Sequence, residues 1–253
     1  MSDFCRHTVL KNDIFSSKDV LSTKTPGRGL TGMIEAIRKK ISQEEFDYQT
    51  LLDCLKEYAR PRDKISDLIK KRVIIRVKKG LYIFGHEYRR RPYSREILAN
   101  LIFGPSYISL DYALQHYGLI PERVEALTSV TTGRSHRFST PVGLFTYRMI
   151  PLEAFSIGMD RIEIDNGRAF LMATPEKALA DKLHEGRGME IQSQKALSRY
   201  LEENLRIDPA ALWGLRPAEL DAIARRYRSR KITLLNDLLR RIHHQAVGGN
   251  DHA

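Results

Sequence analysis

The chain has 253 residues, of which 42% are hydrophobic, so it can bury a sizeable core in one or two domains. Its hydrophobic runs stay far below the roughly 18 residues that cross a bilayer, which excludes a membrane-spanning helix and predicts no membrane partner. The first residues lack the hydrophobic centre of a secretory signal, and we expect a cytoplasmic protein. Cys5 and Cys54 match no metal-ligand or disulfide spacing, so the sequence predicts neither a cofactor nor a metal.

The formal net charge of +11 is concentrated in one stretch. From Arg60 to Arg95, thirteen Lys and Arg residues are opposed by three acidic residues, which leaves +10. A local excess of this kind is typical of a surface that binds a polyanion. The alternative is a solvated basic surface with no partner.

Residues 1–30 are polar and aperiodic, and we expect a flexible N-terminal arm. Hydrophobic periodicity and helix-start residues then predict three helices, and β-branched runs flanking a Lys-Lys-Gly turn predict two strands. The expected elements are helices from Met33 to Lys40, from Asp47 to Tyr58 and from Pro61 to Arg72, and strands Val73–Val77 and Leu81–Phe84. Three helices followed by a hairpin predict a winged helix-turn-helix domain over residues 31–86.

A charged linker, residues 87–93, closes with Pro92 and separates this domain from a second one. Residues 94–247 are predicted to form an α+β domain, and residues 248–253 a frayed tail. The expected elements of this α+β domain are helices that begin at Ser94 and Leu110, a mainly antiparallel sheet, a helix capped by Thr174, and C-terminal helices. The strands of the sheet are expected to start near Leu127, His136, Leu144, Arg161 and Arg168. The predicted fold class is therefore α+β.

In helix-turn-helix proteins the recognition helix lies in the major groove of DNA and nearby basic groups hold phosphates. Here that helix begins at Pro61, and Ile65, Leu68 and Ile69 are expected to face inward. The predicted DNA-binding residues are Arg60, Arg62, Lys64, Ser66, Lys70, Lys71, Arg76, Lys78, Lys79, Arg89, Arg90 and Arg91. Alternatively, Asp63 and Asp67 pair with lysines along the same helix.

A second basic group lies at the junction of the last two long helices. It consists of Arg225, Arg226, Arg228, Arg230 and Lys231. These residues either extend the DNA surface or complement the C-terminal end of a helix dipole.

Three separated motifs occur in order along the chain: RVKKGLY at 76–82, YISLDYALQHYGLI at 107–120 and ATPEKALAD at 173–181. In this order they resemble the signature of AbiEi-type antitoxins, over about residues 31–183. The resemblance implies an N-terminal winged helix, a C-terminal α+β domain and repression of the protein's own operon through double-stranded promoter DNA. It also implies action against a toxin of nucleotidyltransferase type, for which a stable complex between the two proteins is not assumed.

Two other classes of function remain open. Asp160, Glu163 and Asp165 lie close together and would suit a metal-dependent enzyme acting on nucleic acid, although Asp165 also fits the Asp-Asn-Gly turn. No phosphate-binding loop or nucleophile motif accompanies them, so we expect no enzymatic activity. The other alternative is a plain regulator or protein-interaction module without a toxin partner.

Overall fold

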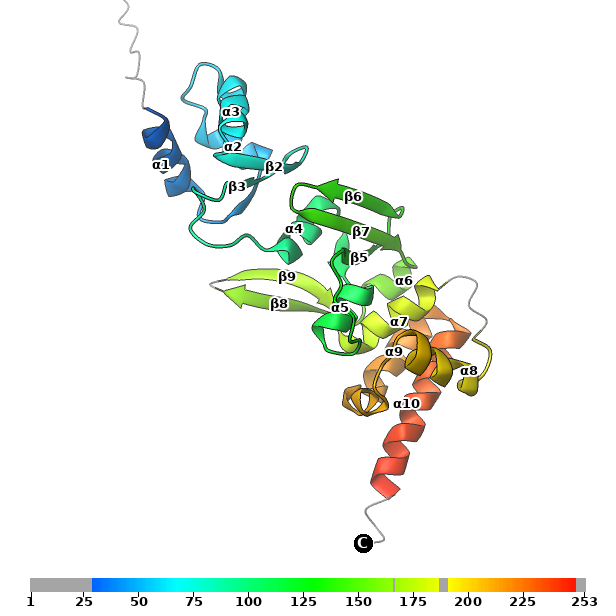
Figure 1. Ribbon diagram of the computed structural model, residues 1–253. Coiled ribbons are helices and arrows are strands. Elements are labelled where there is room, and N and C mark those ends of the chain that lie inside the picture. Colours follow the sequence, from blue (N-terminus) through cyan, green and yellow to red (C-terminus); the bar gives the residue numbers. More distant parts are fainter. Residues whose placement is uncertain (1–28, 166, 187–190, 249–253) are drawn as a thin grey trace, which may run out of the picture.

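A computed structural model describes residues 29–165, 167–186 and 191–248. The predicted tail (248–253) and arm (1–30) lie outside these residues, apart from Gly248, Gly29 and Leu30. The fold is α+β, as predicted, with a three-stranded sheet near one end, a six-stranded sheet in the middle and helices at the other end (Figure 1). Within the described residues, no helix combines the length and the apolar character that crossing a membrane would require.

Residues 29–86, called here the N-terminal unit, contain three helices and one antiparallel sheet. In chain order the elements are α1 (Leu30–Lys40), β1 (Glu45–Asp47), α2 (Tyr48–Cys54), α3 (Pro61–Lys70), β2 (Ile74–Lys78) and β3 (Leu81–Phe84). The strand order is β1-β3-β2. The three predicted helices and the hairpin are confirmed, whereas the short strand β1 was not predicted.

Local signals explain where these elements begin and end. The Asp47 carboxylate caps α2 by accepting the Thr50 N–H at 2.7 Å. Pro61 occupies the first turn of α3, where its missing N–H costs nothing. Gly80 adopts φ +87° in the turn between β2 and β3, which an L side chain would disfavour. Inside, Ile37 of α1, Leu51 of α2 and Leu68 of α3 pack in one buried cluster.

Residues 94–248, the C-terminal unit, are built around a mixed sheet. The elements are α4 (Arg95–Ile102), β4 (Ser106–Ile108), α5 (Leu110–His116), β5 (Leu127–Thr131), β6 (His136–Thr140), β7 (Gly143–Met149), α6 (Leu152–Phe155), β8 (Met159–Asp165), β9 (Arg168–Ala173), α7 (Pro175–Glu185), α8 (Gln194–Arg199), η1 (Tyr200–Asn204), η2 (Pro209–Gly214), α9 (Pro217–Tyr227) and α10 (Arg230–Gly248). The strand order is β6-β7-β5-β4-β9-β8.

The sheet departs from the mainly antiparallel one expected from the sequence. Pairs β4–β5, β6–β7 and β8–β9 are antiparallel, but β5–β7 and β4–β9 are parallel. The difference arises because β6 lies outside β7 instead of between β5 and β7. In addition, the three-residue strand β4, too short to show a period of two, lies between β5 and β9.

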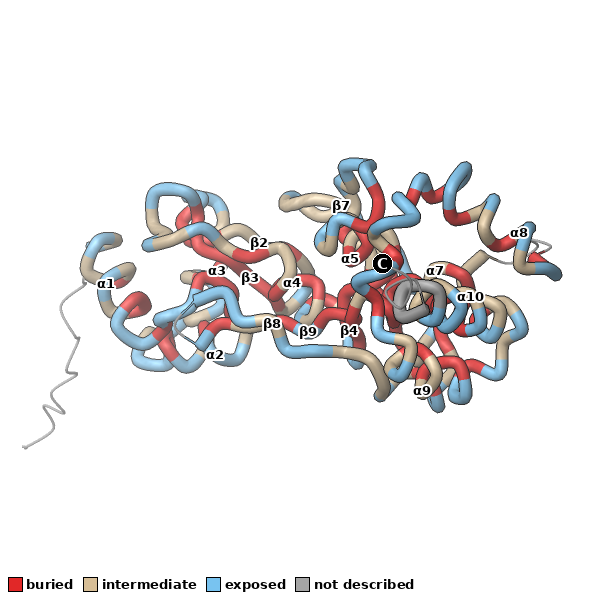
Figure 2. The backbone as a smooth tube through the Cα atoms, turned by 90° about the horizontal axis from the view of Figure 1, so that it is seen from below, coloured by how far each residue is buried: buried red, intermediate tan, exposed pale blue. Residues whose placement is uncertain are grey.

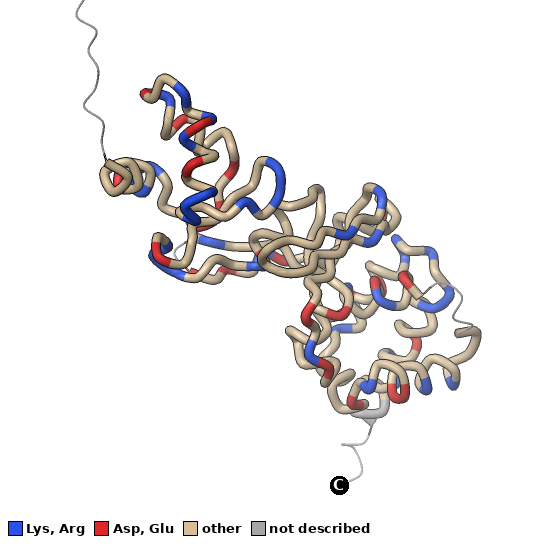
Figure 3. The backbone as a smooth tube through the Cα atoms, turned by 45° about the horizontal axis from the view of Figure 1, so that its top comes forward, with Lys and Arg blue, Asp and Glu red and all other residues tan. Residues whose placement is uncertain are grey.

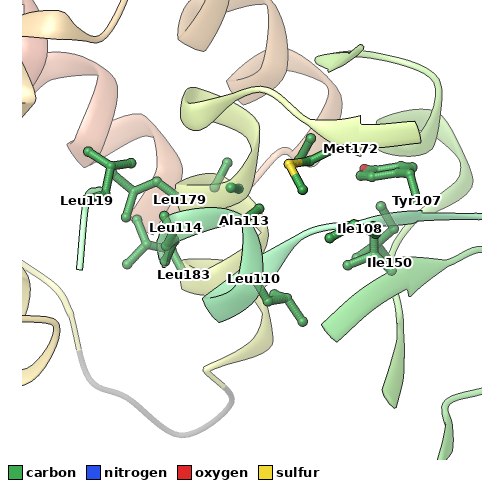
Figure 4. Packing of buried hydrophobic residues seen from close by; sticks show 14 of the residues in the cluster. Tyr107, Ile108, Leu110, Ala113, Leu114, Leu119, Ile150, Met172, Leu179 and Leu183 are labelled. Carbon is green, nitrogen blue, oxygen red and sulfur yellow. The ribbon is translucent and has the colours of Figure 1, made fainter. Parts of the chain in front are cut away.

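Helices α5 and α7 lie side by side in the core of the C-terminal unit (Figure 4). Ala113 and Leu114 of α5 and Leu179 of α7 belong to one buried cluster with Ile108 of β4 and Met172 of β9. Burying aliphatic side chains of this size contributes about 1.5–3 kcal/mol each. This packing holds the second and third sequence motifs against each other.

The same hydrophobic cluster extends into the N-terminal unit. Val77, Leu81 and Ile83, from β2 and β3, are buried in it together with residues of α4 and β4. Figure 2 shows the buried backbone continuing from β3 through α4 toward β9 and β4. The two units therefore share a core across the predicted linker.

Residues 87–93 are held by hydrogen bonds to the N-terminal unit. Arg38 donates to the carbonyl of Tyr88 at 2.9 Å, and the Arg90 N–H donates to Glu44 at 3.1 Å. Arg38 also forms a buried 2.6 Å ion pair with Glu44 and lies 3.6 Å from the centre of the Phe84 ring. The segment is thus fixed against α1 and β3.

Glu45 connects the units directly. Its carboxylate forms a 2.8 Å ion pair with Arg168 of β9, and the two side chains are 0% and 4% exposed. The same oxygen accepts the N–H of Ser94, which caps α4. A buried ion pair needs both partners, because removing one leaves an unpaired charge without water.

We predict that Glu45→Ala lowers the free energy of unfolding by about 3–5 kcal/mol, since it leaves the buried Arg168 guanidinium with only its 3.6 Å contact to the exposed Asp165 carboxylate. The double variant Glu45→Met/Arg168→Met removes both charges and should recover a large part of this loss. Urea unfolding measures both. A loss below about 1 kcal/mol in Glu45→Ala would show that this pair does not hold the units together.

Candidate nucleic-acid interface

Helix α3 presents a polar, basic face to solvent. Ile65 and Leu68 are buried, as predicted, and Arg62, Ser66 and Lys70 are exposed on the opposite side. The Ser66 hydroxyl donates to the Arg62 carbonyl at 3.2 Å, so its oxygen lone pairs remain available as acceptors. Basic residues follow α3 and the β2–β3 turn along one edge of the molecule (Figure 3).

Acidic residues on α3 neutralise this face only slightly. Asp63 pairs with Arg60 at 3.9 Å, and both side chains are largely exposed, so the pair contributes at most about 1 kcal/mol. Within the described residues, neither Asp63 nor Asp67 forms an ion pair with a lysine of the helix. Lys64 is half-buried, and its ammonium lies 5.9 Å from the centre of the Tyr58 ring.

The two lysines of the β2–β3 turn point in different directions. Lys79 is exposed at the turn, whereas the Lys78 ammonium donates to the Ile102 carbonyl at 2.7 Å. The Lys78 ammonium also lies 5.0 Å from the centre of the Phe138 ring of β6. Lys78 is the last residue of β2, after a register shift between Arg76 and Lys78, whereas Lys79 already lies in the turn, so the two side chains leave the backbone in different directions.

Some of the remaining residues of the predicted interface are exposed to solvent, and others contact residues of the protein itself. Lys71 of the α3 C-cap and Arg76 of β2 are exposed. Arg91 instead forms an ion pair with Asp165 at 3.2 Å, and Arg89 lies 5.8 Å from the centre of the Tyr93 ring. The Arg90 side chain is exposed, although its backbone is bound to Glu44.

The second basic group lies at the opposite end of the molecule from α3 (Figure 1). Three of its members contact the protein: Arg225 pairs with Asp221, Arg230 donates to the Gln192 carbonyl and Lys231 donates to the Gly186 carbonyl. Arg226 and Arg228 are exposed. The structure therefore does not bring this group together with the α3 face.

The three candidate metal-binding carboxylates are separated by their arginine partners. Glu163 pairs with Arg161, and Asp165 pairs with Arg91 and with Arg168, the latter at 3.6 Å. Asp160 is exposed on β8. Across the part of the chain that the structure describes, no group of three His, Cys, Asp or Glu side chains has a metal-binding arrangement.

Residues of the second and third motifs meet in a buried polar cluster that sequence reasoning missed. Asp181 of α7 forms an ion pair with Lys177 one turn earlier, and both side chains are 0% exposed. Ser109 and Tyr107 donate to the other Asp181 oxygen, at 2.5 and 3.4 Å. Tyr227 of α9 donates to Asp181 and accepts from Lys177.

The cluster is closely enclosed. Gly158 lies so near that a Cβ atom there would come within 2.9 Å of the Lys177 Cβ. Burial lowers the pKa of Lys177, while the charge of Asp181 opposes that effect. Burial, followed by the charge of Asp181, raises the pKa of both Tyr107 and Tyr227, so both phenols stay protonated as donors. We conclude that this cluster fastens the sheet to α7 and α9.

Glu176, in the same motif, anchors a neighbouring loop. It accepts hydrogen bonds from the Arg216 backbone at 2.9 Å and from the Arg216 guanidinium at 3.1 Å. Burial raises the pKa of Glu176, but these hydrogen bonds outweigh that effect and the net pKa is lowered. The spacing of Glu176, Lys177 and Asp181 on one helix was the available sequence signal, since charged residues among alanines and leucines need partners when the helix is buried.

Neither a protein-family model nor a curated protein matches this chain. The family resemblance of the three motifs therefore stays a prediction.

We predict that Asp181→Ala lowers the free energy of unfolding by about 3–5 kcal/mol, because it leaves Lys177 charged and buried without a counter-ion. Tyr227→Phe removes the hydrogen bond donated to Asp181 and the one accepted from Lys177 but keeps the ion pair, so it should cost less, about 1.5–3 kcal/mol. Thermal and urea unfolding rank the two variants. Equal and small losses would contradict an anchoring role for Asp181.

Proposed function

We propose that this protein is a DNA-binding transcriptional repressor that reads double-stranded DNA through a winged helix in its N-terminal unit. The observation that carries the proposal is the order of elements, helix, strand, two helices and a hairpin, with an antiparallel β1-β3-β2 sheet. The helix before the hairpin has its apolar side buried and its basic side exposed. This matches the placement of a recognition helix beside a wing.

The dimensions of α3 fit the major groove. Its ten residues span roughly 15 Å at 1.5 Å per residue, and an α-helix fits a groove about 12 Å wide. Arg62, in the first turn, can donate two hydrogen bonds to a guanine, and Ser66 lies one turn further along the same face. Lys70 and Lys71, at the other end, are placed to contact phosphates.

The turn between β2 and β3 is the proposed wing. Lys79 at its tip is exposed and contacts phosphate or the minor groove in this proposal. Lys78 has a different role, because its ammonium is bound by the C-terminal unit. It positions the wing and does not neutralise a phosphate.

The family resemblance extends the proposal to autoregulation and to an antitoxin role. We infer that the protein represses its own operon and counteracts a nucleotidyltransferase-type toxin encoded beside it, with no stable complex required. A regulator of this kind acts where the chromosome is, which agrees with the expected cytoplasmic location. The family resemblance is supported by the contacts between its motifs. Residues 107 and 109 of the second motif and residues 177 and 181 of the third meet in one buried cluster, so these motif residues help to build the fold.

We predict that Arg62→Ala reduces the preference for the protein's own upstream DNA over shuffled DNA by about 1–3 kcal/mol, the free energy of one good base contact. Lys79→Ala should weaken binding to both sequences equally and lower the salt slope by about 0.9, as expected for one phosphate contact. Mobility shifts across a salt series measure both quantities.

The matched control is Lys78→Met, which keeps the length of the side chain. It should reduce affinity without lowering the salt slope, since Lys78 makes no phosphate contact in this account. Equal affinity of the wild type for upstream and shuffled DNA would overturn the proposed specific repressor.

We further predict that repression and protection are separable. The triple variant Arg62→Ala/Ser66→Ala/Lys70→Ala should lose repression of a reporter fused to the upstream region, yet still restore growth when co-expressed with the neighbouring toxin. Its fold should persist because all three side chains are exposed. Toxin levels are held constant by an unrelated promoter. If the variant is folded but no longer protects cells from the toxin, the exposed face of α3 is also needed to neutralise the toxin, which would contradict this prediction.

A further inference from the structure

We propose that the loop 132–135 and strand β6 form a second contact for duplex DNA, which holds phosphates that flank the segment read by α3. This inference rests on the proposed function of the N-terminal unit and extends it to the C-terminal unit. The partner is the backbone of the same DNA duplex. Nothing in the contact depends on base sequence.

Charge is the first observation. Residues 126–152, which include this loop and the β6–β7 hairpin, contain Arg134, Arg137 and Arg148 and no acidic residue. Arg148 is neutralised by a 2.7 Å ion pair with Glu185. Arg134 and Arg137 are exposed, and the described part of the chain supplies neither guanidinium group with an ion pair or a hydrogen bond.

Position is the second observation. The hairpin lies beside β2 and the β2–β3 turn (Figure 1), where the Lys78 ammonium comes within 5.0 Å of the Phe138 ring centre. Arg134 lies four residues before Phe138, and therefore at most about 13 Å away at roughly 3.3 Å per residue of extended chain. Successive phosphates of one DNA strand follow at about 3.4 Å along the helix axis, so a duplex that contacts the wing would reach Arg134 within about four further base pairs.

The contact is rigid and offers the groups that bind phosphates. His136 packs against Phe103 with ring centres 4.6 Å apart, and Phe138 packs against Tyr147 at 5.7 Å, so β6 is fixed to the core. Strand β6 is also an edge of the sheet, and the loop before it contains Thr132, Gly133 and Ser135. Backbone N–H groups and small hydroxyl side chains, together with arginines, make most protein contacts to phosphates.

The test compares Arg134→Ala/Arg137→Ala with the control Lys195→Ala/Arg199→Ala, which removes the same charge from exposed positions on α8. Binding to 40-base-pair duplexes of the protein's own upstream sequence and of a shuffled sequence is measured by fluorescence anisotropy across a salt series. We expect the β6 variant to bind both duplexes about tenfold more weakly near 0.1 M salt, with a salt slope lower by about 1.8. The control should keep the wild-type slope, and circular dichroism melts verify folding.

An unchanged slope in the β6 variant, with upstream DNA still preferred, would overturn this inference and leave the proposed repressor intact. A lowered slope in a protein that does not prefer its upstream DNA would support the contact and reject the specific repressor. Absence of binding to either duplex would reject both.

Discussion

Two adjacent carboxylates at the start of β1, Glu44 just before the strand and Glu45 as its first residue, determine how the halves of this molecule are joined. Glu44 holds Arg38 and the backbone of Arg90, which fixes residues 87–93 against the N-terminal unit. Glu45 holds Arg168 and the N–H of Ser94, which fixes the C-terminal unit. Since buried charges are costly without partners, each carboxylate requires its own set of neighbours in place. The hydrophobic core that runs from β3 to β4 can then close between the units.

The fixed junction between the two units limits the orientations in which the proposed DNA-binding surface can be presented. A winged unit on a free linker would carry its recognition helix in many orientations, and binding would have to overcome that freedom. Here Lys78 attaches the β2–β3 turn, the proposed wing, to Ile102 of α4 and Phe138 of β6, which restricts how this turn can move relative to the C-terminal unit. In the proposed complex a duplex bound by α3 would pass the C-terminal unit at a fixed distance, close to Arg134 of the loop before β6 and Arg137 of β6.

The sequence predicted the helix starts and turns that are set by residues within a few positions of one another. Helices capped by Asp47 and Thr174 and the turn at Gly80 were correctly predicted, because those signals act within a few residues. Strands β1 and β4 were missed, since three residues show no period. The contact of Lys78 with Ile102, the pairing of Glu45 with Arg168 and the bond from Tyr227 to Asp181 join residues more than twenty positions apart in sequence, so no local pattern reports them.

In the proposed complex the exposed face of α3 lies in the major groove. A chelated iron that cleaves DNA, attached to Ser66→Cys in a chain whose Cys5 is replaced by serine, tests this most directly, since Cys54 is buried. We expect cuts confined to a few adjacent base pairs of the protein's own upstream DNA, and no localised cuts from the same chelate on Lys195→Cys of α8. Two results would contradict this placement of α3. One is bound protein whose chelate at Ser66→Cys cuts the DNA without localisation, and the other is the same cutting pattern from Ser66→Cys and Lys195→Cys.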